Sequence, residues 1–244
     1  MPIPDAAEIL RIWENGTGAT PSERSVAMLR CASSDAPLSD LVGVTVGERD
    51  RYLIALRAAC FGKGAAGLAA CPKCRLQVEF QFDVTSFLVD LPKQTSRGGR
   101  MSIDGYTIEF RSLTVQDLLH LSTMTDLPTA RQSLIEASVL SAEFEGQRIS
   151  TLDLPNEIIE ALGDAVYDLD PQSDTPVGLA CPGCGHEWQA IFDIASFLYR
   201  EFSIRAERTL HDVHLLARAY GWQENEILTM SPARRRIYLD MASR

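Results

Sequence analysis

The sequence has no long apolar run and no excess of positive charge. A helix that crosses a membrane needs about 20 consecutive apolar residues, and no stretch of the 244 residues approaches that length. The formal net charge of −10 disfavours nonspecific attraction to nucleic acid and to anionic membranes. The first residues, MPIPDAAEILRIWENG, lack the basic-then-apolar order of a secretory signal, so synthesis in the cytoplasm is expected. We expect neither a membrane nor a nucleic acid as a partner.

Signatures of common enzyme classes are also missing. The chain contains no P-loop, no dinucleotide-binding fingerprint, no nucleophile elbow and no kinase motif. Aspartate and glutamate are plentiful, but the pattern pairs no two of them as general acid and base. His211 and His214 lie three residues apart on a predicted helix, a spacing that can reach one metal ion, yet no third ligand accompanies them. We assign no catalytic residue and predict a protein that is not an enzyme.

Cysteine is scarce, but four of the six cysteines belong to two copies of one motif. The segment CPKCRLQVEFQFDVTSFL (71–88) aligns without gaps with CPGCGHEWQAIFDIASFL (181–198), at an offset of 110 residues. The tripeptide Gly-Leu-Ala precedes each copy. Cytosolic thiols are normally kept reduced, which favours clustered metal ligands over disulfides. Cys31 and Cys60 lie outside the repeat and are expected as small buried residues.

A pair of CxxC motifs is the ligand set of a structural zinc site. Two thiolates of one motif can chelate an ion, and four thiolates close a tetrahedron that leaves no position for a substrate. Residues 75–180 separate the motifs, but the entropy of loop closure grows only logarithmically with length, so a folded insert is tolerated. We predict one structural Zn²⁺ with these ligands: Cys71, Cys74, Cys181 and Cys184.

Other interpretations of the cysteines stay open. The motifs can form two separate sites or a site completed between chains, and His186 can replace one cysteine ligand. A redox CxxC normally opens a helix of a thioredoxin-like unit, whereas each motif here precedes an alternating strand pattern. Buried thiols without a metal are the remaining alternative. Lys73 and Arg75 occupy turn positions where the second copy has glycine, which makes the first knuckle the less regular one.

The remaining pattern predicts an α+β fold in three parts. Residues 1–40 are expected as a loosely structured lead-in, residues 41–200 as a zinc-containing α+β body with two CPxC repeats, and residues 201–244 as a helical C-terminal module. In the body, the two knuckle-and-strand repeats close one zinc-ribbon-like site around a helical insert. Thr45 and Glu48 form a capping box ahead of a clear helix. Periodicity and caps predict further elements: a strand Leu76–Phe82, a strand in YTIEFRSL, a helix Val115–Met124, a helix Thr129–Leu140, a turn or hairpin at EFEGQRI and a helix from Pro155 to about Asp168.

The C-terminal module combines short helices with aromatic and basic side chains. The helices are predicted at about Phe197–Ala206, Leu210–Tyr220, Gln223–Leu228 and Ala233–Met241. Its aromatic residues suit either packing within the protein or docking into a groove of a partner. The run of three arginines suits a solvated face or contact with phosphate or an acidic partner. Five residues are therefore candidates for partner binding: Trp222, Arg234, Arg235, Arg236 and Tyr238.

Several segments, taken in order, resemble the T4-like phage baseplate protein family. They are TVGERDRYLIALRAACFG, C-P-x-C followed by FDV, YTIEFRSLTVQDLL, and C-P-x-C-G followed by a second FD. The family includes baseplate hub assembly proteins and relatives encoded beside contractile injection systems. The segment HDVHLLARAYGWQENEILTMSPARRRIYLDM is similar to a helical module of phage-tail and injection-system gene clusters. The resemblance covers roughly residues 40–244.

This resemblance implies a non-enzymatic structural or assembly protein of a contractile tail or injection-system baseplate. Matching of motifs implies that the four repeat cysteines are its zinc ligands. The implied partners are baseplate, hub or spike proteins, and the implied locations are the bacterial host cytoplasm and a phage-like particle. Two other functions stay open: a zinc-ribbon module that binds nucleic acid or has a regulatory role, and a CxxC thiol oxidoreductase.

Overall fold

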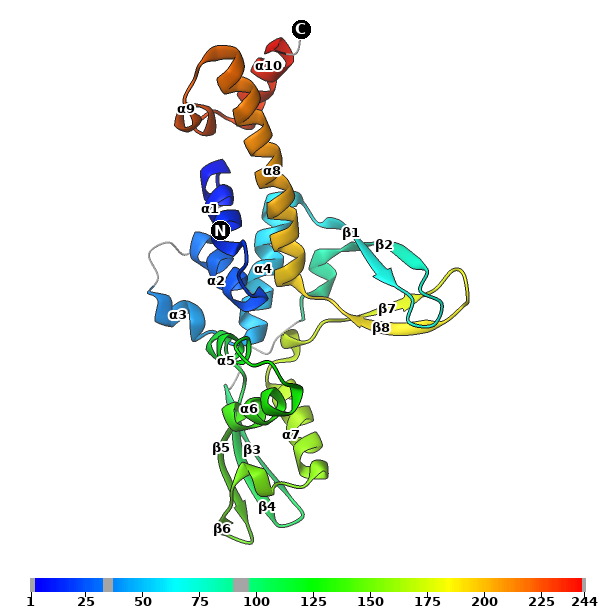
Figure 1. The fold of residues 1–244 in the computed structure, drawn as a ribbon. Coiled ribbons are helices and arrows are strands. Elements are labelled where there is room, and N and C mark those ends of the chain that lie inside the picture. The colour runs from blue at the N-terminus through cyan, green and yellow to red at the C-terminus, as the bar shows by residue number, and fades with distance from the viewer. Residues whose placement is uncertain (1–2, 33–36, 90–96, 243–244) are drawn as a thin grey trace. The chain divides into compact units, whose positions relative to one another are not determined.

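The chain divides into two compact units in a computed structural model that describes residues 3–32, 37–89 and 97–242. The central unit is Asp35–Ile194, and the terminal unit combines Met1–Ser34 with Ala195–Arg244 (Figure 1). Both helices and strands are abundant, which confirms the predicted α+β class. The predicted three-part division stays a prediction, because compact units in one chain do not show which segments fold alone.

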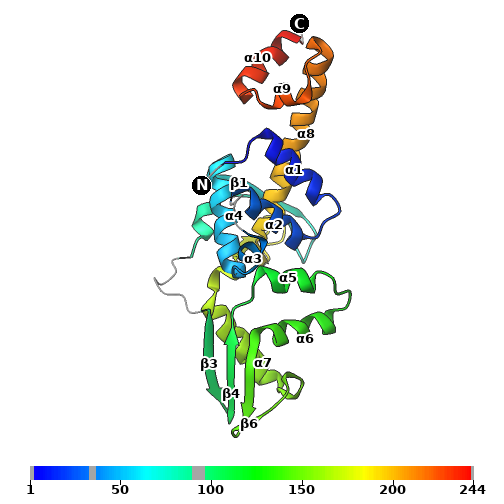
Figure 2. The ribbon, with the colours of Figure 1, turned by 90° about the vertical axis from the view of Figure 1, so that its left-hand side faces the viewer.

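A four-stranded antiparallel sheet with two helices forms one part of the central unit (Figure 2). The strand order is β3-β4-β5-β6. The elements are β3 Gly98–Ile103, β4 Tyr106–Arg111, β5 Val139–Phe144, β6 Gln147–Arg148, α6 Leu127–Ser138 and α7 Asn156–Leu169. This sheet lies between the two cysteine motifs in the sequence, so the insert predicted as helical is itself α+β. The strand β3 was not predicted, because its short sequence, GGRMSI, shows little hydrophobic alternation.

Alternation along β4 explains which face of this sheet is buried. Ile108 and Phe110 point into a core that also contains Ile135 of α6 and Leu162 of α7, whereas Glu109 between them is exposed. The predicted strand at YTIEFRSL and the predicted helix after Pro155 are confirmed by β4 and α7. Burial of one face of the sheet under two helices supplies the hydrophobic stabilisation that short strands need.

Two tight turns connect the strands of this sheet. Asp104 and Gly105 join β3 to β4 with φ of 49° and 81°, and Glu145 and Gly146 join β5 to β6 with φ of 50° and 81°. Positive φ at both central residues is typical of hairpin turns whose twist matches that of the strands. The hairpin predicted at EFEGQRI is confirmed. The hairpin of β3 and β4 was not predicted, although its Asp-Gly pair is a comparable signal.

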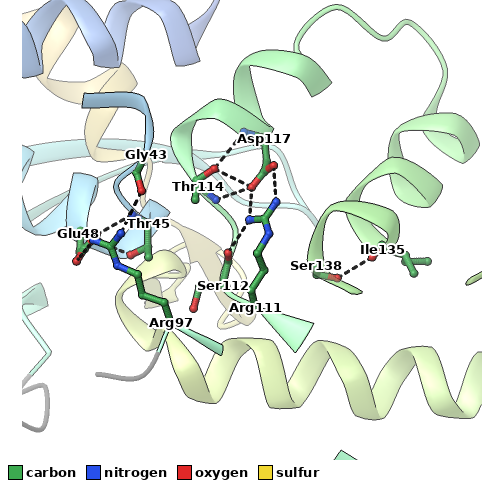
Figure 3. A network of polar contacts seen from close by, with 10 residues as sticks. All are labelled: Gly43, Thr45, Glu48, Arg97, Arg111, Ser112, Thr114, Asp117, Ile135 and Ser138. Carbon is green, nitrogen blue, oxygen red and sulfur yellow. Dashed lines mark hydrogen bonds and ion pairs between the residues drawn. The ribbon is translucent and has the colours of Figure 1, made fainter. Parts of the chain in front are cut away.

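Helices α4 (Val46–Phe61) and α5 (Val115–Leu121) begin with the same capping device (Figure 3). Thr45 and Glu48 form a capping box at α4, as predicted, and Thr114 and Asp117 form one at α5. A β-bridge between Thr45 and Thr114 holds the two helix starts together. Both helices follow a Thr-Val-x-acid pattern, so one short motif determines where each begins.

An arginine neutralises the acidic residue of each capping box (Figure 3). Arg97 donates to both carboxylate oxygens of Glu48, at 3.0 and 2.9 Å. Arg111 pairs with Asp117 through two nitrogens, with Nη1 donating to Oδ2 at 2.8 Å and Nη2 donating to Oδ1 at 2.9 Å. Burial raises the pKa of Asp117, but the hydrogen bonds from Arg111 and Thr114 outweigh it and hold the pKa below its usual range. Arg97 precedes β3 and Arg111 ends β4, so the two arginines connect this end of the sheet to the helix starts and are structural.

A second long-range contact reaches the start of α4. The backbone N–H of Gly47 donates to Asp170 Oδ2 at 2.8 Å in a buried position. Asp170 precedes the short helix η3 (Pro171–Ser173) and is 123 residues away in the sequence. A carboxylate at a helix N-terminus satisfies a free N–H and interacts favourably with the helix dipole. Asp170 therefore serves as an additional cap supplied from a distant segment.

The terminal unit contains the remaining long helices. Its elements are α1 Ala6–Gly16, α2 Pro21–Ala32, α8 Ile194–Tyr220, α9 Glu224–Leu228 and α10 Pro232–Ala242. The predicted break between Phe197–Ala206 and Leu210–Tyr220 is wrong, because α8 runs through without interruption. No glycine or proline occurs in α8, and the Thr209 hydroxyl donates to the carbonyl of Arg205, one turn earlier, so nothing ends the helix there.

The first residues are more regular than the loosely structured lead-in that was expected. Asp5 and Glu8 form a capping box at α1, and Ile9 and Ile12 are buried. The Tyr199 hydroxyl of α8 donates to the carbonyl of Trp13 at 3.1 Å. The spacing of Asp5 and Glu8 ahead of the apolar Ile9 and Ile12 is a sequence signal for α1 that the expectation did not use. The central unit also contains three short elements, which are α3 Leu38–Val42, η1 Val84–Phe87 and η2 Thr151–Asp153.

Candidate metal centre

Two β-hairpins of the central unit carry the cysteine motifs at their turns (Figure 1). Their strands are β1 Gly64–Ala70, β2 Gln77–Asp83, β7 Pro176–Ala180 and β8 Glu187–Ile191. The last pair before the turn is Ala70 with Gln77 in the first hairpin and Ala180 with Glu187 in the second. These pairs are related by the 110-residue offset of the repeat, so the two copies share their register as well as their sequence.

The knuckles have the same backbone hydrogen bonds. Cys71 N–H donates to the carbonyl of Leu76, and Arg75 N–H donates to the carbonyl of Cys71, both at 2.9 Å. In the second copy, Cys181 N–H donates to His186 and Gly185 N–H donates to Cys181, again at 2.9 Å. The first knuckle was expected to be the less regular one, but its backbone bonding matches that of the second.

This regularity requires an unusual conformation of Arg75. Its φ is 64°, close to the 67° of Gly185 at the equivalent position. Glycine adopts the left-handed region without cost, whereas a side chain makes it unfavourable by about 1 kcal/mol or more. The first knuckle therefore reaches the same geometry as the second at the expense of backbone strain.

We expect Arg75→Gly to raise the free energy of unfolding of the metal-loaded protein by about 0.5 kcal/mol. Gly185→Arg should lower it by about 1 kcal/mol, because it introduces the same strain in the second knuckle. Lys73→Gly is the matched control: Lys73 lies in the same turn and has no positive φ, so this change should destabilise. Urea unfolding measures all three. Equal effects of Arg75→Gly and Lys73→Gly would show that lost charge, not backbone strain, decides.

The four cysteine sulfurs meet where the hairpin turns come together. Cys71 Sγ lies 3.7 Å from Cys184 Sγ, and Cys74 Sγ lies 3.5 Å from Cys181 Sγ. All four lie within 4.8 Å of one another. A disulfide needs about 2.05 Å, whereas a tetrahedron of thiolates about 2.3 Å from a central zinc has edges of about 3.8 Å. The separations therefore fit a metal ion between the hairpins.

The thiols of this cluster have shifted pKa values. Burial raises the pKa of Cys71, but backbone N–H groups of Cys74 and Lys73 donate to its sulfur and lower the pKa to about 7. The backbone N–H of Leu76 lowers the pKa of Cys74, but the neighbouring sulfurs outweigh it and raise the pKa to about 12. Four thiolates this close repel one another, so simultaneous ionisation requires a cation among them.

Apolar side chains support the cluster from both copies. Val78 and Trp188, related by the repeat offset, pack against the buried Cys71 and Cys181. Phe82 contacts its own counterpart, Phe192, edge to face, with ring centroids 5.2 Å apart. These contacts add apolar packing between the two hairpins beside the sulfurs.

His186 and the other cysteines lie outside the group. His186 stacks on Trp188 and does not belong to the set of mutually close ligand atoms. Cys31 and Cys60, expected to be buried, are half-buried. Burial raises the pKa of the Cys31 thiol, and the carboxylate of Glu8 adds to this. The strands before each knuckle, β1 and β7, were not predicted, although the repeated Gly-Leu-Ala was a signal for them.

The five candidate partner-binding residues belong to the terminal unit. Trp222 stacks on Tyr220 at 4.5 Å and meets Tyr238 edge to face at 4.8 Å. Arg234 lies over the Tyr238 ring, 5.6 Å from its centroid. Arg235 is buried, while Arg234 and its other neighbour, Arg236, are exposed, so the three arginines do not form one solvated run. A role of these residues in partner binding stays a prediction.

Comparisons with known proteins gave one match. The family model described as "T4 bacteriophage base plate protein" matches residues 19–199, a segment that includes both hairpins. No curated protein and no solved structure matches the chain.

Within the described residues, every helix is too short or too polar to cross a membrane.

Proposed function

The chain belongs to the T4 bacteriophage base plate protein family, and from this premise we propose that it is a non-enzymatic structural or assembly protein of a contractile tail or injection-system baseplate. The family match over residues 19–199 is the observation that carries this proposal. Its partners are baseplate, hub or spike proteins. It is made in the bacterial host cytoplasm and acts there or as part of a phage-like particle.

A zinc-ribbon-like site with four cysteine ligands stabilises the protein in this proposal. Cys71, Cys74, Cys181 and Cys184 hold one Zn²⁺, and the support is the close approach of their sulfurs at the turns of two matched hairpins. Four thiolates leave zinc without an open position, so the site is structural and contributes stability rather than chemistry. Since 106 residues lie between Cys74 and Cys181, the ion also closes a long loop of the central unit.

Two other functions have less support. A thiol oxidoreductase places its CxxC at the start of a helix, where the dipole stabilises a thiolate, whereas both motifs here lie at turns between strands. A zinc ribbon that binds nucleic acid needs positive charge, and the chain carries a net charge of −10. Both alternatives predict activities that a baseplate protein lacks, namely disulfide turnover and a salt-sensitive gel shift.

Deletion of the gene that encodes this protein, from the phage or injection-system genes of its host, tests the proposed function. We expect tails or injection particles without complete baseplates, seen by electron microscopy, and rescue by the wild-type gene. The double variant Cys31→Ser/Cys60→Ser should rescue, because these cysteines lie outside the cluster, whereas Cys71→Ser/Cys181→Ser should not. Normal baseplates after deletion would refute the proposal. Mass spectrometry of purified particles then shows whether the protein stays in the particle or leaves after assembly.

A further inference from the structure

Helices α8 and α10 of the terminal unit line a cavity of about 650 Å³. Arg208 of α8 and Arg235 and Arg236 of α10 contribute positive charge to its wall. Pro232 and Leu239, on the same face of α10, contribute apolar surface. A volume of this size is typical of sites for a small ligand or a few side chains. Neither the metal centre nor the sheet of the central unit takes part in it.

Arg235 is the unusual member of this wall. The residue is only 6% exposed, and its Nε and Nη1 atoms are buried without a hydrogen-bond partner among the described residues. Burial of two guanidinium nitrogens without partners is costly, because their lost hydration is not replaced. By this argument, a methionine at this position is expected to be at least as stable as the arginine. An arginine buried in this way is expected where an external anion completes its hydrogen bonds.

The remaining wall residues restrict which anion fits. Glu207 and Asp212 of α8 also line the cavity, so a polyanion such as a nucleic acid or a polyphosphate would meet two carboxylates as well as the arginines. The net charge of −10 of the whole chain also disfavours the binding of a polyanion. A single carboxylate with apolar groups beside it matches the guanidinium fork, the apolar residues and the volume together.

We propose that this cavity binds a carboxylate presented by an apolar peptide segment of a partner protein. On binding, the Arg235 guanidinium shifts so that the carboxylate reaches Nε and Nη1, which have almost no exposed surface in the free protein, and the flanking apolar side chains pack on Pro232 and Leu239. Arg208 and Arg236 attract the carboxylate to the opening. This inference does not depend on the metal or on the baseplate role.

A capped pentapeptide with one glutamate between leucines tests the proposal on the full-length, metal-loaded chain. The same peptide with glutamine is the matched probe, and inorganic phosphate is the small-anion probe. We expect the glutamate peptide to shift the Nε–Hε resonance of Arg235 in NMR spectra and to bind at least roughly tenfold more tightly than the glutamine peptide. Absence of any difference between the peptides would overturn the proposal. Phosphate binding as tight as that of the peptide would replace it by a small-anion site.

Substitution of Arg235 separates a binding role from a structural one. Arg235→Met should abolish the preference for the glutamate peptide and leave the melting temperature unchanged or a few degrees higher, because it removes an uncompensated buried charge. Arg234→Met is the control: Arg234 is exposed on Tyr238 and does not line the cavity, so the preference should persist. A lower melting temperature for Arg235→Met with no binding by the wild type would show that the arginine only supports the fold.

Discussion

Removal of the metal should unfold the central unit. We expect one zinc ion per chain by elemental analysis, and its extraction by a strong chelator to cost on the order of 10 kcal/mol, the apparent binding energy of structural zinc in small domains. This is comparable to the whole stability of an ordinary domain. The two hairpins then depend on apolar contacts such as that of Phe82 with Phe192, which are worth far less than the metal. Circular dichroism during thermal unfolding, with and without chelator, measures the loss.

Cysteine variants show whether the metal acts through the predicted ligands. Cys181→Ser should reduce the zinc content and the melting temperature about as strongly as chelation, because Cys181 is buried and three ligands remain. Cys31→Ser and Cys60→Ser remove thiols outside the cluster and should leave the zinc content unchanged. A metal-free protein with an undiminished melting temperature would refute the structural role of the metal. Disulfide-linked pairs in purified protein would favour the redox alternative.

The arrangement of the candidate site was largely predictable, because repetition is a signal that does not depend on packing. The copies at residues 71–88 and 181–198 share cysteines, spacing and the strand pattern that follows. Similar sequences adopt similar hairpins, and the four cysteines of two knuckles supply the four ligands of one tetrahedral ion. The strands before the knuckles were harder to predict, because GAAGLAA and PVGLA consist mostly of small residues without alternation.

Local signals also explain which parts of the fold were predicted and which were not. Helix α4 was predicted because its start, at Thr45 and Glu48, is a capping box. Helix α8 was wrongly divided, because the polar residues of Glu207–Thr209 interrupt the apolar stripe although nothing there breaks the backbone. Hydrophobic periodicity reports burial of a face, whereas helix ends depend on caps, glycine and proline. A long helix with a weak apolar stripe is therefore easily divided.

Contacts between distant segments were beyond sequence reasoning. In the sequence, Arg234, Arg235 and Arg236 form one basic run, and only the packing of α10 shows that the middle arginine is buried beside a cavity. Similarly, nothing near Gly47 in the sequence indicates that Asp170 caps the same helix. A side chain from 123 residues away leaves no local pattern. The burial of Arg235 and the capping of α4 by Asp170 both depend on which segments pack together, and only the structure shows this packing.

The contact with Asp170 makes Gly47 a position where alanine should be strongly destabilising. In an ordinary helix this change stabilises by about 0.5–1 kcal/mol. Here an added Cβ would lie 1.9 Å from Asp170 Oδ1, closer than any real contact, and Asp170 is 6% exposed. Either the buried carboxylate or the start of α4 must move, and the hydrogen bond from the Gly47 N–H is lost. We expect Gly47→Ala to lower the free energy of unfolding by about 3–4 kcal/mol, measured by urea unfolding of the metal-loaded protein.

A matched control and a double variant identify the cause. Gly163 lies inside α7, and an added Cβ would meet nothing within 4 Å, so Gly163→Ala should stabilise by about 0.5–1 kcal/mol. Asp170→Ala alone should cost about 1–2 kcal/mol through the lost cap. In the double variant Gly47→Ala/Asp170→Ala the clash is absent, so its loss should be clearly smaller than the sum of the single losses. Additive losses would mean that the two residues do not act on each other, and the cap supplied by Asp170 would then have to be abandoned as the reason for glycine at this position.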